Sequence, residues 1–272
     1  MDKIYGNGYS YMDVVCFFLL ALATSCSSSK LSGAHPALST TPTLIVFSGE
    51  SNSGGQALNK DATDIELAIR SRVQILNNLN FRFEGLDIGT NNNLDHCCYI
   101  DTHTQHGWEL ELANRLYGGT ILKDTVYLVK AGQGGSTISQ WDEGGIYYTK
   151  FKQRMDSAIL KLTRQYGKNP EIVFFYTQGI NDALAATNID KWKSATLAHF
   201  EKIRTRYGNI PIYVPYFMKG FTEYNTALDQ IASTVSGIKM VSSANAALED
   251  AYHWNYAGMK MVAGSLIDAW IQ

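Results

Sequence analysis

"IVFSGESNSGG", residues Ile45–Gly55, carries an apolar run directly into a turn rich in glycine and serine. Such a pattern is typical of a buried strand and the loop that follows it. Ser51 stands in this loop between an acid and an asparagine. The stretch alone does not distinguish a nucleophilic serine from a polar residue in a strand-ending turn, so the rest of the chain must supply partners for Ser51.

Short β-branched or aromatic runs alternate with longer amphipathic segments beyond this stretch. Strands are expected at Thr43–Ser48, Thr125–Lys130, Glu171–Thr177, Ile210–Tyr216 and Ile238–Ser242. Helices are expected at Trp108–Tyr117, Tyr147–Tyr166, Asp190–Tyr207, Thr222–Val235 and Asn255–Ile271. Strands of nearly continuous apolar character, such as "IVFFY" at residues 172–176, fit a parallel sheet covered on both faces. The alternation predicts an α/β fold, a three-layer α/β/α sandwich around a central, mostly parallel five-stranded sheet.

Length and composition indicate one enzyme-sized domain. The chain has 272 residues, of which 45% are hydrophobic and 18% charged, which suits a single sizeable core. Its formal net charge of -2 argues against the basic surface of a nucleic-acid-binding protein.

The first residues predict export. Val14–Ala23 is an apolar run of ten residues, too short to cross a bilayer and suited to a secretory signal. The "TSCSSSK" that follows resembles the lipobox of bacterial lipoproteins, which implies that Cys26 is acylated. We expect a signal peptide at residues 1–25, a flexible tether at 26–42, a folded domain at 43–272, and a periplasmic or cell-surface protein anchored to the membrane through lipid. A buried N-terminal helix is the alternative.

Residues 77–106 interrupt the alternation and predict an inserted loop or hairpin at the rim of a site. Metal-ligand residue types gather in it: His96, Cys97, Cys98, Asp101, His103 and His106. Their spacing matches no zinc-binding pattern, so we expect no metal, and a histidine or Tyr99 instead touching substrate. The adjacent cysteines are expected to be packed thiols rather than a strained vicinal disulfide.

The chemistry that Ser51 requires is present elsewhere in the chain. A serine hydroxyl needs a base in contact, normally histidine, and a third group that fixes the histidine tautomer. In "EDAYHWNYAG", Asp250 stands three residues before His253, close enough for its carboxylate to reach the imidazole. The alternative is that both are solvated residues before a helix cap at Asn255. Ser53 is the alternative nucleophile.

Donors for an oxyanion follow two further strands. "KAGQGGSTISQW" offers a glycine backbone N–H, and "YTQGINDA" offers the side-chain amide of Asn181. Parallel sheets bind ligands outside the carboxyl ends of their strands, so these segments are expected to meet near Ser51. An α/β-hydrolase nucleophile elbow does not fit, because "GESNSG" misses G-x-S-x-G by one residue.

Together these segments resemble the four blocks of the SGNH (GDSL-like) hydrolase superfamily, and within it the sialate O-acetylesterase and carbohydrate acetylesterase branch. The matching residues are Gly49-Glu50-Ser51-Asn52, Gly134-Gly135-Ser136 with Trp141, Gln178-Gly179-Ile180-Asn181-Asp182, and Asp250 with His253. The resemblance also covers "GWELELANRLYG" at residues 107–118 and implies a flavodoxin-like SGNH hydrolase fold. Two departures from the branch are Glu50, where it usually has glutamine, and Ile180-Asn181, where it usually has a pair containing glutamate.

The resemblance implies a role for each matched residue. Ser51 is the expected nucleophile, His253 the general base and then acid, and Asp250 the residue that orients it. The oxyanion hole is expected from Ser51 N–H, Gly134 and Asn181, with Gly132 and Gly135 as alternatives to Gly134. Substrate contacts are expected from Asn52, Gly135, Gln178, Trp141 and Trp254, although the two tryptophans are equally compatible with packing in a pocket wall.

The expected function is a serine esterase that removes O-acetyl groups from a carbohydrate, such as a plant-type polysaccharide, a glycan or sialic acid, through an acyl-enzyme. The resemblance implies no metal and no organic cofactor. The alternatives are an SGNH lipase or thioesterase acting on longer acyl esters, and an inactive carbohydrate-binding surface lipoprotein. No protein partner is inferred.

Overall fold

A seven-stranded sheet forms the centre of the protein. The computed structural model describes residues 41–69, 72–94, 102–121, 123 and 125–272. The strand order is β4-β3-β6-β1-β7-β8-β9, and every neighbouring pair is parallel except β3 and β4. The strands are β1 (Thr43–Gly49), β3 (Val73–Leu76), β4 (Phe83–Gly85), β6 (Val126–Gly132), β7 (Glu171–Thr177), β8 (Ile212–Pro215) and β9 (Ile238–Val241). Two short strands, β2 (Ala57–Leu58) and β5 (Gln105–His106), pair separately.

The predicted fold class is confirmed, but the predicted number of strands is wrong. All five expected strands are present with ends that differ by at most two residues from the expected ones. The sheet gains β3 and its antiparallel partner β4, which join beside β6 at one edge. Their runs of four and three residues are too short to stand out as periodic patterns in sequence.

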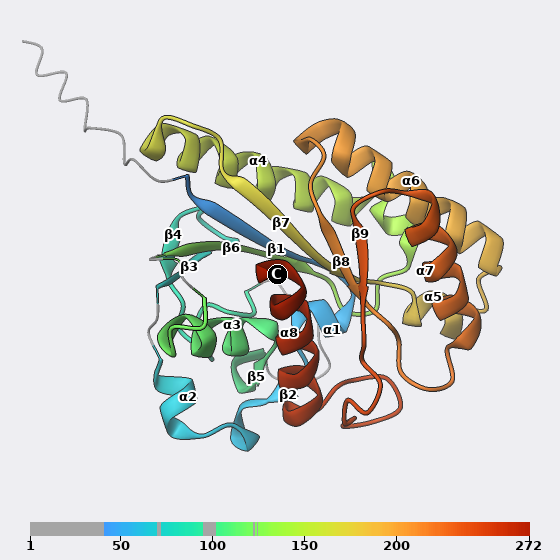
Figure 1. The fold of residues 1–272 in the computed structure, drawn as a ribbon, viewed down its shortest axis with the longest axis horizontal. Helices are drawn as coiled ribbons and strands as arrows, with labels where there is room; N and C mark the ends of the chain where they lie inside the picture. The colour runs from blue at the N-terminus through green and yellow to red at the C-terminus, as the bar shows by residue number, and fades with distance from the viewer. Residues whose placement is uncertain (1–40, 70–71, 95–101, 122, 124) are drawn as a thin grey trace, which may run out of the picture. The chain divides into compact units, whose positions relative to one another are not determined.

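Helices cover both faces of the sheet (Figure 1). One layer contains α4 (Ile146–Tyr166), α6 (Ile189–Tyr207) and α7 (Thr222–Thr234). The other contains α3 (Trp108–Tyr117) and α8 (Tyr256–Ile271), which pack against each other. The short helices are α1 (Ser51–Gly54), α2 (Asp64–Ala68) and α5 (Ile180–Leu184), and single 3₁₀ turns occur at Asn59–Asp61, Thr102–Thr104 and Ile138–Trp141.

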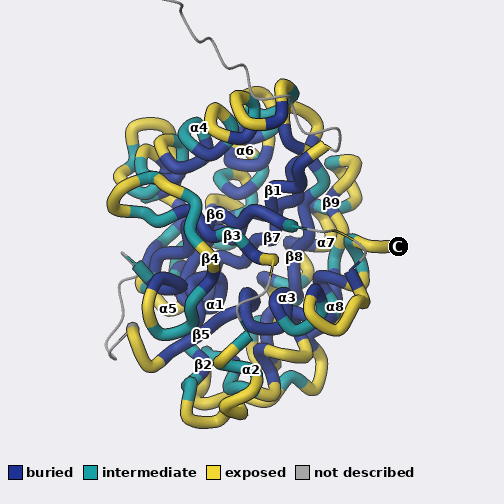
Figure 2. The backbone as a smooth tube through the Cα atoms, turned by 90° about the vertical axis from the view of Figure 1, so that its left-hand side faces the viewer, coloured by how far each residue is buried: buried dark blue, intermediate teal, exposed yellow. Residues whose placement is uncertain are grey.

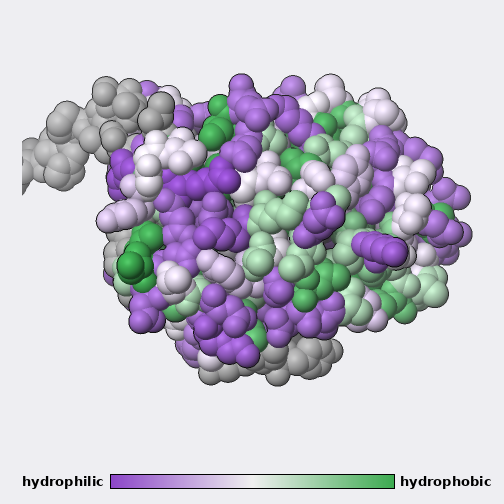
Figure 3. Space-filling view, turned by 60° about the horizontal axis from the view of Figure 1, so that its bottom comes forward, coloured by the Kyte–Doolittle hydropathy of each residue, from purple (hydrophilic) through white to green (hydrophobic). Residues whose placement is uncertain are grey.

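The core lies between these layers. Figure 2 shows the sheet strands as the buried centre, with exposed residues toward the periphery. Every residue of β1 is buried, as a central strand covered on both faces requires. Phe151, Met155 and Leu162, which share one face of α4, are also buried against the sheet. On the face seen in Figure 3, hydrophilic and hydrophobic side chains are intermixed, in contrast with the apolar core.

Register brings three strand ends together. Gly49 at the end of β1 lies opposite Gly132 of β6 and Thr177 of β7. Gly49 has a φ of 120°, and a Cβ at this position would lie 1.9 Å from the carbonyl oxygen of Thr177. Only glycine therefore lets the chain leave β1 at this point and turn toward the ends of its two neighbours.

The predicted signal peptide, residues 1–25, and nearly all of the predicted tether lie outside the described residues. Along the part of the chain that the structure describes, no helix has the length and apolar character needed to cross a membrane.

Candidate active site

The loop after β1 places Ser51 at the start of α1. The N–H of Glu50 donates to the carbonyl of Thr177 at 2.8 Å, and the N–H of Gly55 donates to the carbonyl of Ser51 at 2.8 Å. These bonds hold a tight turn directly after the strand. Ser51 keeps 6% of its surface exposed, whereas Ser53 is fully buried and donates to the Glu50 carbonyl at 2.7 Å. Of the two serines, Ser51 is therefore the accessible one.

The loop before α8 presents His253. Two backbone bonds close it as a hairpin, from Glu249 N–H to the His253 carbonyl at 2.8 Å and from Asn255 N–H to the Ala247 carbonyl at 3.1 Å. Asn52 connects the same loop to α1, because its amide donates to the Tyr252 carbonyl at 2.8 Å and accepts from Trp254 N–H at 3.2 Å. The residues on either side of His253 are thus attached to the neighbour of Ser51.

Ser51, His253 and Asp250 form a hydrogen-bonded series. The distance from Ser51 Oγ to His253 Nε2 is 3.0 Å, and that from His253 Nδ1 to Asp250 Oδ2 is 2.7 Å. Asp250 Oδ1 accepts two backbone N–H bonds, from Tyr252 at 2.7 Å and from His253 at 2.8 Å. With Nδ1–H donating to the carboxylate, Nε2 is left to accept the serine proton, which is the arrangement required for nucleophilic attack by a hydroxyl.

The Asp250 carboxylate is held in its charged form. Partial burial acts to raise its pKa, but the hydrogen bond from His253 and the two backbone N–H bonds outweigh it and lower the pKa below the ordinary value. A charged carboxylate behind the imidazole stabilises the imidazolium that forms when His253 takes up a proton.

The second and third blocks follow β6 and β7 at the same edge of the sheet. The N–H of Gln133 donates to the Gly49 carbonyl at 2.8 Å, and the N–H of Ile138 donates to Asp182 Oδ2 at 2.8 Å, so the two blocks are connected to the first and to each other. Gly134 and Asn181 are half-buried. Gly134 therefore lies in an accessible loop and Asn181 in the first turn of α5, both beside the strand end that carries Ser51.

The neighbouring glycines differ in their surroundings. A Cβ on Gly132 would lie 2.4 Å from the backbone nitrogen of Gly54, so this glycine is used for the packing of α1 on β6. Gly135 is exposed with a φ of 73°, and a Cβ there would meet nothing within 4 Å. The loop is thus open at Gly135 and closed at Gly132.

Four residues expected to contact substrate are buried in the structure. The indole rings of Trp141 and Trp254 are fully buried, so neither presents a face to a sugar. Gln178 donates to the Ser136 carbonyl and accepts from Trp192 Nε1, and Asn52 makes the two bonds to the His253 loop described above. The burial of the two tryptophans favours the alternative of packing, although Trp254 Nε1 has no hydrogen-bond partner there. For Asn52 and Gln178 the expected substrate contact is corrected: their polar atoms bond to protein partners and support the loops of the site. Gly135 stays a prediction.

Glu50 is recognisable in the sequence only as a departure from the glutamine that is usual at this position, and the structure shows that it belongs to the site. Its side chain is fully buried, and its carboxylate accepts hydrogen bonds from Ile180 and Asn181 of the third block. Burial raises its pKa to about 7 against the opposing effect of these bonds. Its position directly before Ser51 was the signal available in the sequence.

The predicted rim loop is only partly described. His96, Cys97, Cys98, Tyr99 and Asp101 lie outside the described residues. His103 Nδ1 bonds to the Gly89 carbonyl at 2.9 Å, and His106 Nδ1 to Asn59 Oδ1 at 2.9 Å. Within the described ranges, no group of three histidine, cysteine, aspartate or glutamate side chains is arranged to hold a metal ion.

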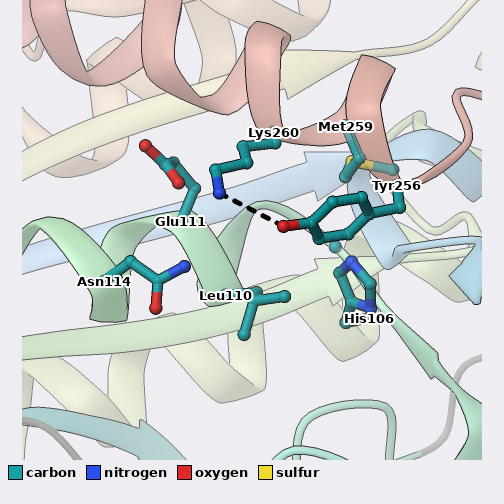
Figure 4. A pocket seen from close by; sticks show the side chains of 8 residues that line it. His106, Leu110, Glu111, Asn114, Tyr256, Met259 and Lys260 are labelled. Atoms are coloured by element: carbon teal, nitrogen blue, oxygen red, sulfur yellow. Dashed lines mark hydrogen bonds between the residues drawn. The ribbon is translucent and has the colours of Figure 1, made fainter. Parts of the chain in front are cut away.

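His106 lines a small pocket between α3 and α8 (Figure 4). Burial lowers its pKa to about 4, so the imidazole is neutral near pH 7. Across the pocket, Lys260 Nζ donates to Tyr256 Oη at 3.1 Å and to Glu66 at 2.7 Å. Lys260, Tyr256 and Glu66 thus form one hydrogen-bonded cluster, which joins α2 to α8.

Comparisons with known proteins agree on family and fold. The family model for "carbohydrate esterase, sialic acid-specific acetylesterase" matches residues 41–272. A structure of a protein from Arabidopsis thaliana is similar with a TM-score of 0.68 at 17% identity, over 85% of this chain and 98% of that chain. NanS is similar with a TM-score of 0.57 at 14% identity, over 86% of this chain and 98% of that chain.

A structure from Parabacteroides merdae, described as that of a GDSL-like lipase, is similar with a TM-score of 0.50 at 13% identity, over 86% of this chain and 98% of that chain. No curated protein matches the sequence. At these identities the structural similarities establish the fold alone.

Proposed function

The chain belongs to the sialic acid-specific acetylesterase family of carbohydrate esterases, and from that premise we propose that it is a serine esterase which removes O-acetyl groups from a carbohydrate through an acyl-enzyme. The family makes it a carboxylic ester hydrolase. The proposal adds the catalytic residues, the covalent intermediate and the class of alcohol released.

In the proposed reaction, His253 Nε2 takes the Ser51 proton as Ser51 Oγ attacks the acetyl carbonyl. The resulting oxyanion accepts hydrogen bonds from Ser51 N–H, the Gly134 backbone and the Asn181 amide. The C–O bond to the sugar then breaks, and the sugar oxygen leaves with the proton from His253. A water molecule, deprotonated by His253, attacks the acetyl-serine and releases acetate, which restores Ser51.

The observation that carries the proposal is the unbroken series from Ser51 Oγ through His253 to Asp250, at 3.0 and 2.7 Å. An inactive binding protein has no use for a buried amide that connects the serine loop to the histidine loop, as Asn52 does. The accessible Ser51 hydroxyl and the hydrogen bonds by which Asn52 holds the His253 loop both favour catalysis over binding alone.

Purified protein is expected to release acetate from at least one of acetylated xylan, acetylated pectin and O-acetylated sialic acid. Among simple esters, kcat/KM should fall by about tenfold or more from an acetyl to an octanoyl ester, because a site built for acetyl lacks room for a long chain. Acetate is measured enzymatically and the chain-length series with chromogenic esters. Faster turnover of octanoyl than acetyl esters would instead indicate a lipase or thioesterase. Failure of a fluorophosphonate to label the protein while it labels a control esterase would indicate an inactive binding protein.

We also propose that the chain is exported and anchored through lipid on Cys26. Cys26→Ala removes the acyl acceptor, so the variant is expected in the soluble rather than the membrane fraction of a bacterial host that processes lipoproteins. Cys16→Ala is the matched control and should stay in the membrane fraction, because Cys16 lies in the segment expected to be cleaved. Fractionation and the mass of the mature N-terminus provide the measurement, and an intact N-terminus in the cytosol would contradict the proposal.

A further inference from the structure

Glu50 joins the serine loop to the third block through a buried carboxylate. Its Oε1 accepts the Ile180 N–H at 3.0 Å. Its Oε2 accepts from Asn181 twice, from the backbone N–H at 3.2 Å and from the side-chain amide at 2.8 Å. Because Glu50 directly precedes Ser51, a single side chain connects the candidate nucleophile to a candidate oxyanion donor.

An ionised carboxylate determines which way the Asn181 amide faces. A carboxylate only accepts hydrogen bonds, so it attracts the NH₂ group of an amide and repels its oxygen. With one N–H directed at Glu50, the second N–H of the same NH₂ group stays available as a donor in a fixed direction. If the amide turned over, its oxygen would take the place of the NH₂ group and would repel a developing negative charge.

We propose that the ionised Glu50 carboxylate is a positioning residue, which holds the Asn181 amide in the donor orientation that the oxyanion requires, and that protonation of Glu50 releases this amide. The inference rests on the proposed function, because it acts through the assigned oxyanion role of Asn181. It makes the reaction depend on the ionisation of a buried carboxyl that does not itself touch the substrate.

The energetics of Glu50 support a functional role. Burial raises its pKa from 4.5 to about 7, while hydrogen bonds from residues 179–181 act in the opposite direction. The folded state therefore binds this proton more tightly than the unfolded state does, so ionisation of Glu50 lowers the free energy of unfolding as the pH rises from 4.5 toward 7. A carboxylate kept buried at a cost to stability is typical of functional sites.

Titratable neighbours do not explain why Glu50 ionises. Tyr176 of β7 and Tyr224 of α7 both interact with its charge, and Asp182 of α5 acts on the same two tyrosines. None of these three groups carries a positive charge. The N–H donors of Ile180 and Asn181 therefore stabilise the carboxylate. The same hydrogen bonds allow the carboxylate to orient the Asn181 amide.

Glu50→Gln is the direct test, because glutamine keeps the shape but replaces one acceptor oxygen with an NH₂ donor. We expect kcat for acetate release to fall by about tenfold to a hundredfold, with KM nearly unchanged, since the amide is misplaced rather than removed. In the wild type, log kcat/KM should rise with pH on the acid limb with a slope approaching about two, because Glu50 must lose a proton in addition to the general base. In Glu50→Gln that slope should approach about one.

Asn181→Ala provides a second test that does not depend on how Glu50→Gln folds. If Glu50 acts through the Asn181 amide, the slope should also approach about one in this variant. Glu66→Gln is the matched control: Glu66 likewise accepts several hydrogen bonds, but in the contact between α2 and α8, so the slope of about two should persist.

A wild-type slope of about one would overturn the inference, as would a Glu50→Gln variant with wild-type kcat and slope. Activity that rises in Glu50→Gln would also overturn it, because the protonated carboxyl would then be the active form. If Ser51→Ala is inactive in the same assay, such a result leaves the esterase proposal standing. If Ser51→Ala retains full turnover, the esterase proposal itself fails.

Discussion

Ser51→Ala is expected to lower kcat for acetate release by roughly 10⁵- to 10⁶-fold while the fold is retained. The substitution removes only the hydroxyl group. Its Oγ lies 3.0 Å from His253 Nε2, the atom that accepts the proton in the proposed reaction. Without it no acyl-enzyme forms, and the remaining oxyanion donors and substrate contacts support only slow attack by water. Kinetics at saturating substrate measure the loss, and a circular dichroism melt verifies the fold.

Ser53→Ala is the matched control for this experiment. Ser53 lies two positions away on the same short helix, is buried, and donates to the Glu50 carbonyl. Its loss is expected to cost about 1 kcal/mol of stability and to leave the acetyl-serine step intact. If Ser53→Ala were inactive and Ser51→Ala active, the assignment of the nucleophile would be reversed.

The fold was predictable where its determinants are local. Long apolar stripes, such as Phe151, Met155 and Leu162 of α4, and continuous apolar runs, such as that of β7, specify elements that bury one or both faces. The edge strands β3 and β4 were missed because they contain few residues, and what makes them strands is hydrogen bonding to β6 and to each other. Such pairing is a tertiary property that the pattern of a short segment does not contain.

The site was predictable as far as chemistry constrains it. A nucleophilic serine requires a base and an orienting acid, and the expected proximity of Ser51 and His253 is present across 202 positions of sequence. Their catalytic roles stay predictions. The supporting contacts were not predictable, because an asparagine or tryptophan near a catalytic motif has the same residue type whether it faces substrate or the interior. Trp254 and Asn52 illustrate the second case.

Two of the residues at which the sequence departs from the usual blocks, Glu50 and Asn181, are side-chain partners in the structure. Glu50 and Ile180-Asn181 are the positions at which the chain differs from the usual acetylesterase blocks, and they lie 130 and 131 positions apart. In the folded protein they are direct hydrogen-bond partners. Glu50 accounts for Asn181, whose side-chain amide donates to the carboxylate. It does not account for the residue type of Ile180, which donates only its backbone N–H.

Asp250→Asn is expected to lower kcat by about 10³- to 10⁴-fold, and the geometry of Asp250 explains why the effect is so large. Asp250 Oδ1 accepts two backbone N–H bonds, from Tyr252 and His253. An asparagine keeps its oxygen at that position, because an NH₂ group there would face two donors. Its NH₂ group is then directed at His253 Nδ1, where the carboxylate oxygen was.

This orientation imposes the wrong tautomer on His253. Nδ1 must accept from the new NH₂ group, so the ring proton moves to Nε2, which then donates toward Ser51 Oγ instead of accepting its proton. Asp250→Ala is the informative comparison, since it imposes no tautomer, and we expect it to retain more activity than Asp250→Asn provided that its melting temperature shows a folded loop. The measurements are kcat for both variants and the ¹⁵N chemical shifts of the His253 ring. Wild-type kcat in Asp250→Asn, or a proton that stays on Nδ1, would show that Asp250 does not orient the base.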